Sequence, residues 1–203
     1  MEQIYEQHLW GGKTFDFYSG EGSHNTQIIQ PYLNVVTGFL ISQDEPLTVC
    51  DLGCGDFNVG EHLVPHSSNY IAIDIVESLI DRNKKLYKAD NLEFRCLDIA
   101  KDELPKTDCV ILRQVLQHLS NQEIQSIVKK LSHYKYIILT EHLPRGTFVP
   151  NIDMISSQGN RLKLNSGVDL LAEPFNLKIK EQKLLVETIV DHGRITTTLF
   201  TRF

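Results

Sequence analysis

Residues 48–60, TVCDLGCGDFNVG, join a short apolar run to a turn that contains two glycines and two acids. Asp51 ends the apolar run, Gly53, Gly55 and Asp56 follow it closely, and a helix is expected after the turn. Glycines at the carboxyl end of a buried strand permit positive φ angles and let a ligand approach the backbone without a Cβ in the way. The pattern predicts a ligand-binding turn, although an ordinary tight strand-to-helix connection would use the same glycines.

Two further acids follow the next two predicted strands. Asp74 ends YIAID, 23 residues after Asp51, a spacing that suits a carboxylate accepting hydrogen bonds from ribose hydroxyls. Asp98 follows the strand predicted at 92–97, at the position for a hydrogen bond from an adenine amino group. An acid after each of three successive strands is a stronger signal than the glycines alone. The predicted occupant is a nucleoside.

The charge of the turn separates two classes of nucleoside cofactor. A dinucleotide-binding turn has the pattern G-x-G-x-x-G, and Asn58 stands in place of its third glycine. Asp51 and Asp56 would repel a pyrophosphate, whereas S-adenosylmethionine carries a cationic sulfonium and an ammonium group that carboxylates attract. The residues therefore favour S-adenosylmethionine over NAD. Asp56 has an alternative role, because an acid at this point also caps a following helix.

The elements that would position these residues follow from the alternation of β-rich runs with helical patterns, which predicts a parallel sheet with crossover helices. Ser120 and Glu123 have the spacing of a helix-capping box. The helix that follows would carry one apolar stripe, made of Ile124, Ile127, Val128 and Leu131. The segment before the first strand supports one helix, or two with a bend at Pro31. The sequence predicts strands at 47–51, 70–74, 92–97, 108–112 and 135–140, helices at 76–88 and 120–132, and a C-terminal hairpin.

Composition limits the class of protein. With 203 residues, of which 41% are hydrophobic and 23% charged, the chain is expected to form one globular domain. A formal net charge of −6 opposes nonspecific binding to phosphate backbones, so a nucleic-acid partner is not expected. The start MEQIYEQHLW lacks the basic and apolar parts of a secretory signal, and no apolar run approaches the roughly 18 to 20 residues of a membrane span. A cytoplasmic location without membrane insertion is expected, and no oligomeric state is indicated.

The cysteines favour a reduced protein without a metal site. Cys50, Cys54, Cys96 and Cys109 form no CxxC pair, and three of them lie in apolar strand-like runs. They are therefore predicted to be core thiols rather than metal ligands or disulfides.

Several motifs together resemble a known family. They are VCDLGCG, Asp74 in IAIDI, Asp98 in CLDI, the strand that runs into LRQVLQHLS, and the final hairpin. From about residue 47 to 203 the chain resembles the class I S-adenosylmethionine-dependent methyltransferases. The pieces WGG, YSGEGSH, CGDFN and DIVESLI resemble a small, poorly characterised bacterial subgroup, which implies no substrate. The implied fold is a Rossmann-like α/β fold with a seven-stranded mixed sheet of order 3-2-1-4-5-7-6, the last strand antiparallel, and helices on both faces.

The resemblance also implies which residues hold S-adenosylmethionine. The methionine part would lie against the glycine turn, the ribose on the acid that ends the second strand, and adenine between an apolar side chain and the third acid. The residues at the methionine part would be Asp51, Gly53, Cys54 and Gly55. Asp74 would hold the ribose, Ile75 would pack on adenine, and Asp98 and Ile99 would meet the adenine edge. Arg113 and Gln114 would lie beside the sulfonium.

The expected reaction is an in-line displacement in which an acceptor attacks the sulfonium methyl group. His142, His118 and Glu141 are the candidate bases for an acceptor that must lose a proton. The alternative roles are structural: His118 would close a short helical turn, and His142 would open a loop. The acceptor is expected to be a small molecule, and the competing hypothesis is a noncatalytic S-adenosylmethionine-binding module.

The predicted organisation is one domain in four parts. These are an N-terminal helical cap or flap at 1–46, a cofactor-binding core at 47–142, a lid-like insertion at 143–183 and a hairpin at 184–203. Trp10 is expected to be a packing anchor. Asn151, Asp153 and Arg161 would either hold the shape of the insertion or face the acceptor.

Overall fold

The computed structural model describes residues 2–203 with the exception of 13 and 15. Seven strands form one mixed sheet of order β3-β2-β1-β4-β5-β7-β6, with β7 antiparallel to both of its neighbours, so the predicted fold class is confirmed. The chain divides after Thr107 into two compact units. The strands are β1 (Thr48–Leu52), β2 (Asn69–Asp74), β3 (Leu92–Cys96), β4 (Cys109–Arg113), β5 (Tyr136–Leu143), β6 (Glu181–Val190) and β7 (Gly193–Thr201).

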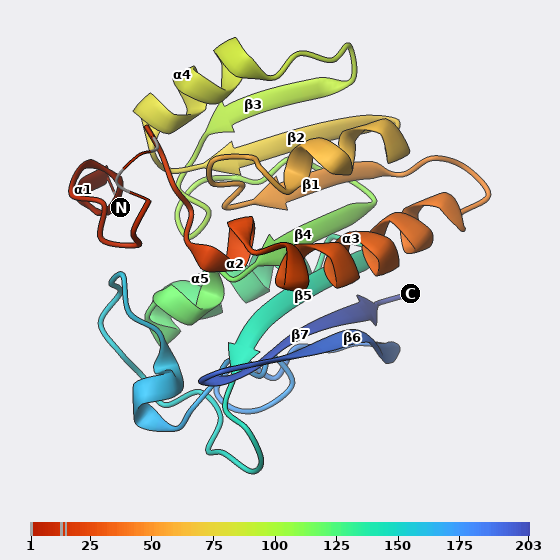
Figure 1. Ribbon diagram of the computed structural model, residues 1–203. Coiled ribbons are helices and arrows are strands. Elements are labelled where there is room, and N and C mark those ends of the chain that lie inside the picture. The colour runs from red at the N-terminus through yellow and green to blue at the C-terminus, as the bar shows by residue number, and fades with distance from the viewer. Residues whose placement is uncertain (1, 13, 15) are drawn as a thin grey trace. The chain divides into compact units, whose positions relative to one another are not determined.

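The first unit is built on three parallel strands. In the register of β1, β2 and β3, Asp51 lies opposite Ala72, and Asp74 opposite Cys96. Helix α4 (Glu77–Leu86) packs against β2 and β3 and buries Leu79 and Ile80, as Figure 1 shows for its position beside β3. Because the strands are parallel, their carboxyl ends bring Asp51 and Asp74 to one edge of the sheet in this unit.

Three helices precede β1: α1 (Glu2–Glu6), α2 (Glu21–His24) and α3 (Thr26–Ile41). Helix α3 is continuous through Pro31, so the predicted bend does not divide it. The Asn25 side chain caps its start by accepting a hydrogen bond from the Gln27 amide at 2.9 Å. Trp10 packs against Tyr5 at 5.4 Å between ring centroids, which is the expected role as a packing anchor.

The helix expected directly after the glycine turn is absent from the described residues, and that prediction is wrong. Two short 3-10 turns, η1 (Gly60–His62) and η2 (Val64–His66), stand there instead. Phe57 adopts a positive φ of 65° and buries its ring against Tyr70, Tyr87 and Phe94. A buried aromatic ring so early in the segment turns the chain inward, and Pro65 lacks the amide that a longer helix would need.

The second unit contains the other four strands. β4 and β5 are parallel, whereas β5, β7 and β6 run antiparallel, with a bulge between Leu184 and Val186. Helix α5 (Asn121–Leu131) begins with the predicted capping box of Ser120 and Glu123. Its buried stripe is also the predicted one: Ile124, Ile127, Val128 and Leu131. Within the described residues, no helix is long and apolar enough to cross a membrane.

Candidate functional site

The glycine turn leaves β1 in a conformation that requires glycine. Gly53 and Gly55 have φ angles of 81° and 56°, in the left-handed region that residues with a Cβ seldom adopt. The amides of Gly53 and Cys54 both donate to the Ile73 carbonyl at 2.8 Å. The turn is therefore fastened to the end of β2, one residue before Asp74.

Asp74 lies directly on this turn. Its carboxylate accepts hydrogen bonds from the Gly55 amide at 3.1 Å and from the Val76 amide at 3.1 Å. The side chain is only 7% exposed, and burial raises the pKa of Asp74 although these backbone amides lower it. The structure thus brings Gly55 and Asp74 together, as a site for the methionine and ribose parts of S-adenosylmethionine would require.

Residues beyond β2 and β3 offer an apolar and an acidic contact. Ile75, which follows Asp74, is 46% exposed and so offers an apolar surface beside the buried acid. Asp98 accepts hydrogen bonds from the Ala100 amide at 2.9 Å and pairs with Lys101 at 2.8 Å. Burial raises the pKa of Asp98, but the contacts with Lys101 and Ala100 outweigh it, so the pKa is lowered. Asp98 is therefore a carboxylate at neutral pH.

The structure shows all four cysteines to be free thiols, but not all of them are core residues. Cys50 and Cys109 are buried and Cys54 is half-buried, whereas Cys96 is exposed, because it ends β3 at the edge of the sheet. The prediction of core thiols is therefore wrong for Cys96. Among the residues that the structure describes, no group of three or more His, Cys, Asp or Glu side chains is placed to bind a metal ion.

Asp51 is turned toward the core of the first unit. The Tyr70 hydroxyl donates to its carboxylate at 3.0 Å, and both side chains are buried. Burial and the neighbouring Asp51 raise the pKa of Tyr70, so this hydroxyl keeps its proton. The carboxylate of Asp51 thus has a partner within the protein fold, which the sequence pattern did not indicate.

Asp56 does not cap a helix, so that interpretation is wrong. Its carboxylate accepts a hydrogen bond from the Ser19 amide at 2.8 Å and contacts His24 Nε2 at 2.6 Å. Its own amide donates to Ser19 Oγ at 2.8 Å. Asp56 therefore joins the N-terminal segment to the glycine turn across 37 residues of sequence. No local pattern could have indicated this contact, because the two residues lie far apart in the sequence and neither belongs to a periodic stretch.

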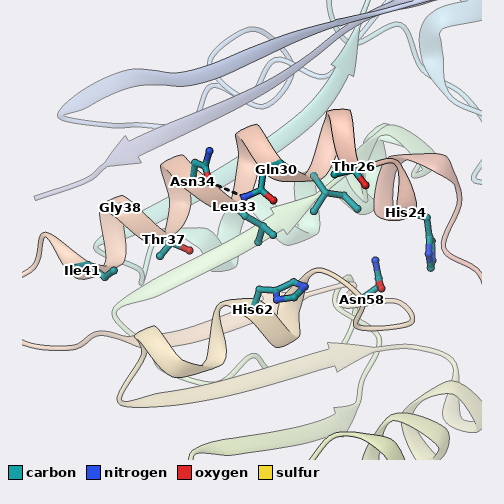
Figure 2. A pocket seen from close by; sticks show the side chains of 11 residues that line it. His24, Thr26, Gln30, Leu33, Asn34, Thr37, Gly38, Ile41, Asn58 and His62 are labelled. Atoms are coloured by element: carbon teal, nitrogen blue, oxygen red, sulfur yellow. Dashed lines mark hydrogen bonds between the residues drawn. The ribbon is translucent and has the colours of Figure 1, made fainter.

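An open pocket of about 700 Å³ lies in the first unit between α3 and the turn η1. Figure 2 shows His24 and Asn58 at one end and Ile41 at the other, with His62 opposite the helix. Its lining mixes polar side chains with Ile29, Leu33 and Ile41, and it carries no carboxylate or permanent cation. None of the predicted cofactor residues lines it, so this pocket is distinct from the site at Gly55 and Asp74.

In the second unit, Gln114 follows β4 with a positive φ of 56°. Its amide donates to the Thr140 carbonyl at 2.7 Å, while its side-chain Nε2 is buried and has no hydrogen-bond partner among the described residues. A strained backbone and an unpaired buried amide are typical of residues that complete their contacts on binding a ligand. Arg113, the residue before it, ends β4.

His118 is fixed by two contacts. Its Nδ1 lies 2.7 Å from the Gly159 carbonyl, and its Nε2 lies 3.1 Å from the Gln117 side-chain amide. This geometry fits a neutral imidazole that donates to the carbonyl and accepts from Gln117. Burial lowers the pKa of His118, which favours the same neutral form. The contacts support the structural interpretation of His118.

His142 and Glu141 differ in their surroundings although they are neighbours on β5. The His142 amide donates to Gln117 Oε1 at 3.1 Å, and its ring Nε2 is buried without a partner among the described residues. Burial and then the nearby His192 lower the pKa of His142. Glu141 is 2% exposed, and burial raises its pKa to about 8 although Arg161 opposes the shift. At neutral pH the ring of His142 is therefore unprotonated, and Glu141 is mostly protonated. Gln117, which contacts both histidines, was not indicated by any sequence pattern.

Arg161 holds the long segment 143–183 in place. The side chain is 1% exposed and donates to the carbonyls of Leu116, Leu119 and Ile152 at 3.0, 2.6 and 3.1 Å. Asn151 and Asp153 bond to backbone groups nearby, at Asp169 and Asn121 respectively. These polar residues therefore maintain the shape of the segment, which was one of the two roles expected for them.

Comparisons with known proteins agree with this geometry. Residues 50–134 match the family model of a methyltransferase domain. Phosphoethanolamine N-methyltransferase 3 of Arabidopsis thaliana is 29% identical over 94 residues, which cover 43% of this chain and 19% of that protein. An uncharacterized RNA methyltransferase of Clostridium tetani is 25% identical over 152 residues, covering 72% of this chain and 32% of that protein. The chain thus spans less than a third of the length of either curated relative.

Solved structures share the fold over nearly the whole chain. The N-methyltransferase NodS of Bradyrhizobium japonicum WM9, in complex with S-adenosylhomocysteine, superposes with a TM-score of 0.68 at 11% identity, covering 98% of this chain and 97% of that one. Magnesium protoporphyrin IX methyltransferase of Synechocystis PCC 6803, with bound S-adenosylmethionine, gives 0.61 at 17% identity, with coverage of 99% and 94%. The fold is that of the class I S-adenosylmethionine-dependent methyltransferases. The match of residues 50–134 to a methyltransferase domain agrees with this fold.

Proposed function

We propose that the protein transfers a methyl group from S-adenosylmethionine to a small-molecule acceptor. The observation that carries the proposal is the position of the Asp74 carboxylate, 3.1 Å from the Gly55 amide at the end of β2, with the exposed Ile75 beside it. A buried acid on a glycine turn next to an exposed apolar side chain suits a ribose and an adenine ring. The methyltransferases of this fold that hold S-adenosylmethionine or S-adenosylhomocysteine support the choice of cofactor.

The cofactor-binding residues divide by the part of the molecule they would hold. Asp74 would accept hydrogen bonds from the ribose hydroxyls, and Ile75 would pack on adenine. The turn would contact the methionine part mainly through its backbone, since the Asp51 carboxylate is already bonded to Tyr70. The remaining assignments are Gly53, Cys54 and Gly55 at the methionine part, Asp98 and Ile99 at the adenine edge, and Arg113 and Gln114 toward the sulfonium.

When bound, S-adenosylmethionine supplies an electrophilic methyl group on its sulfonium. The residues of the chain would act by aligning the acceptor with that methyl group and by excluding water. His142 is the favoured base for an acceptor that must lose a proton, because its ring is neutral and its Nε2 has no partner among the described residues. Glu141 is mostly protonated at neutral pH, and both ring nitrogens of His118 are engaged, so these two are weaker candidates.

The formal net charge of −6 supports a small acceptor over a polyanionic one. The name of the clostridial relative makes RNA the acceptor class to test against it. A protein that binds the cofactor but transfers no methyl group, such as a sensor or a partner subunit, is the competing function.

A transfer assay with S-adenosylmethionine labelled on its methyl group separates these functions. The purified protein is incubated with a low-mass metabolite extract and, separately, with total RNA. We expect label in the low-mass fraction only; label in RNA would overturn the small-molecule acceptor, and cofactor binding without any transfer would favour the noncatalytic module. His142→Gln should lower the turnover number without weakening cofactor binding. His133→Gln, at an exposed histidine of the same unit, is the matched control.

A further inference from the structure

The segment 16–24 lies against the glycine turn through one buried acid. Asp56 is 3% exposed, and it contacts the Ser19 amide at 2.8 Å and His24 Nε2 at 2.6 Å. The Asp56 amide donates in return to Ser19 Oγ at 2.8 Å. One residue of the turn therefore holds two points of the segment that are five positions apart.

Both ends of the segment are fastened to the same region. Arg82 donates to the Asp16 carboxylate at 2.8 and 3.0 Å, and it also donates to the Asp56 carbonyl at 3.1 Å. At the other end, the Asn58 side chain donates to the Ser23 carbonyl at 2.6 Å, and Figure 2 shows Asn58 beside His24. Asp56 thus belongs to a small polar network that includes the start and the end of the segment.

The segment approaches Gly55 so closely that no residue with a side chain could replace this glycine without a clash. A Cβ placed on Gly55 would lie 2.4 Å from Ser19 Oγ and 3.6 Å from the Tyr5 hydroxyl. The same glycine donates its amide to Asp74. The absence of a side chain at Gly55 therefore makes room for Ser19. The segment covers one side of the glycine turn, whose Gly55 amide is bonded to Asp74.

We propose that residues 16–24 form a strap that closes over the cofactor turn, and that Asp56 is the positioning residue that latches it through Ser19 and His24. This inference rests on the proposed cofactor site at Gly55 and Asp74. The latch consists of hydrogen bonds and one acid–imidazole contact, which can break and re-form without disrupting an apolar core. With the latch closed the bound cofactor is retained, and with it open the cofactor exchanges.

The dissociation rate of S-adenosylhomocysteine tests the latch. Trp10 is the only tryptophan, and it packs on Tyr5, whose hydroxyl lies 3.2 Å from Ser19 Oγ, so its fluorescence is a direct readout of this region. We expect Ser19→Gly, which removes the hydroxyl that accepts from the Asp56 amide, and His24→Ala, which removes the imidazole contact to the Asp56 carboxylate, each to raise the dissociation rate by about tenfold, while the thermal midpoint changes little. His24→Gln retains a donor for Asp56 and should recover part of the loss.

Two controls share the chemistry of these changes without touching the strap: His62→Ala, on the far side of the pocket in Figure 2, and Ser68→Gly, at an exposed position after η2. Both should dissociate at the wild-type rate. If the Ser19 and His24 variants also keep the wild-type rate, the latch is refuted. A wild-type protein that binds no S-adenosylhomocysteine would instead refute the proposed function. Asp56→Asn adds a third test, and the Ser19 and His24 variants decide the question if it fails to fold.

Discussion

Two acids near the glycine turn have different surroundings and therefore different tasks. Asp74 accepts hydrogen bonds from two backbone amides at the end of β2, which hold its carboxylate in place for the proposed contact with ribose hydroxyls. Asp56, one residue after Gly55, is committed to Ser19 and His24. The identity of an acid in the sequence does not distinguish these roles, because the partners come from distant parts of the chain.

Replacing Asp74 by asparagine should weaken S-adenosylmethionine binding by about tenfold or more. The amide retains one acceptor oxygen, so the Gly55 and Val76 amides and the ribose can no longer all be satisfied. Calorimetric titration of the folded variant measures the dissociation constant. Asp44→Asn, at an exposed acid of the same unit, is the control that should bind as the wild type does. An unchanged dissociation constant in Asp74→Asn would remove the basis for the ribose assignment.

Glu141 makes the folding stability depend on pH. Its pKa in the folded protein is about 8, against 4.5 for an exposed glutamate, so between these values the folded state holds a proton that the unfolded state has released. The stabilisation is fully present below pH 4.5 and is lost as the pH rises through about 8. The contribution of this group to the free energy of unfolding should therefore fall by about 1.4 kcal/mol per pH unit in that window.

Glu141→Gln removes the titrating group and should flatten this pH dependence. Urea denaturation at several values between pH 5 and 8 measures it. Glu103→Gln, at an exposed glutamate, should leave the slope of the wild type unchanged. A Glu141→Gln variant with the wild-type slope would mean that another group is responsible.

At the scale of elements, the regular pieces were predictable and the irregular ones were not. The strands and the helix α5 follow from period-two and helical patterns, and the capping box of Ser120 and Glu123 is a local signal. The two 3-10 turns after Gly55 were missed, because they depend on burial of the Phe57 ring against residues of three other elements. The secondary-structure propensities of neighbouring residues do not predict how the Phe57 ring packs against residues distant in the sequence.

Arg161 holds the segment 143–183 in place within the second unit, so replacing Arg161 should lower the free energy of unfolding. Arg161→Lys keeps the charge but cannot reach the three carbonyls and the Asn121 side chain that the guanidinium contacts. We expect the free energy of unfolding to fall by about 2 to 4 kcal/mol, since buried acceptors lose their donors. Urea denaturation measures the loss. Arg145→Lys, at an exposed arginine of the same segment, should change stability by less than about 0.5 kcal/mol; equal losses would contradict the special role of Arg161.

At the scale of the whole chain, the class of protein could be predicted because it rests on motifs at the ends of successive strands, and the sheet order was implied by the family resemblance that those motifs carry. Asp51, Asp74 and Asp98 each follow an apolar run, and such signals are local. The contacts that shape the sites are not: Ser19 and Asp56 are 37 residues apart, and Arg161 and Leu116 are 45 apart. A flap at 1–46 and an insertion at 143–183 were expected from the sequence. Hydrogen bonds between distant polar side chains leave no periodic trace in a sequence, so the contacts of Asp56 and Arg161 that hold these segments required the structure.

The central claim is that the turn at Gly53 and Gly55 binds S-adenosylmethionine, and separate calorimetric titrations of the wild-type protein with S-adenosylmethionine and with NAD test it most directly. Neither titration requires knowledge of the acceptor. The geometry of Asp74 and the acids beside the turn predict saturable binding of S-adenosylmethionine and no heat of binding with NAD. Binding of NAD, or of neither compound, would contradict the claim.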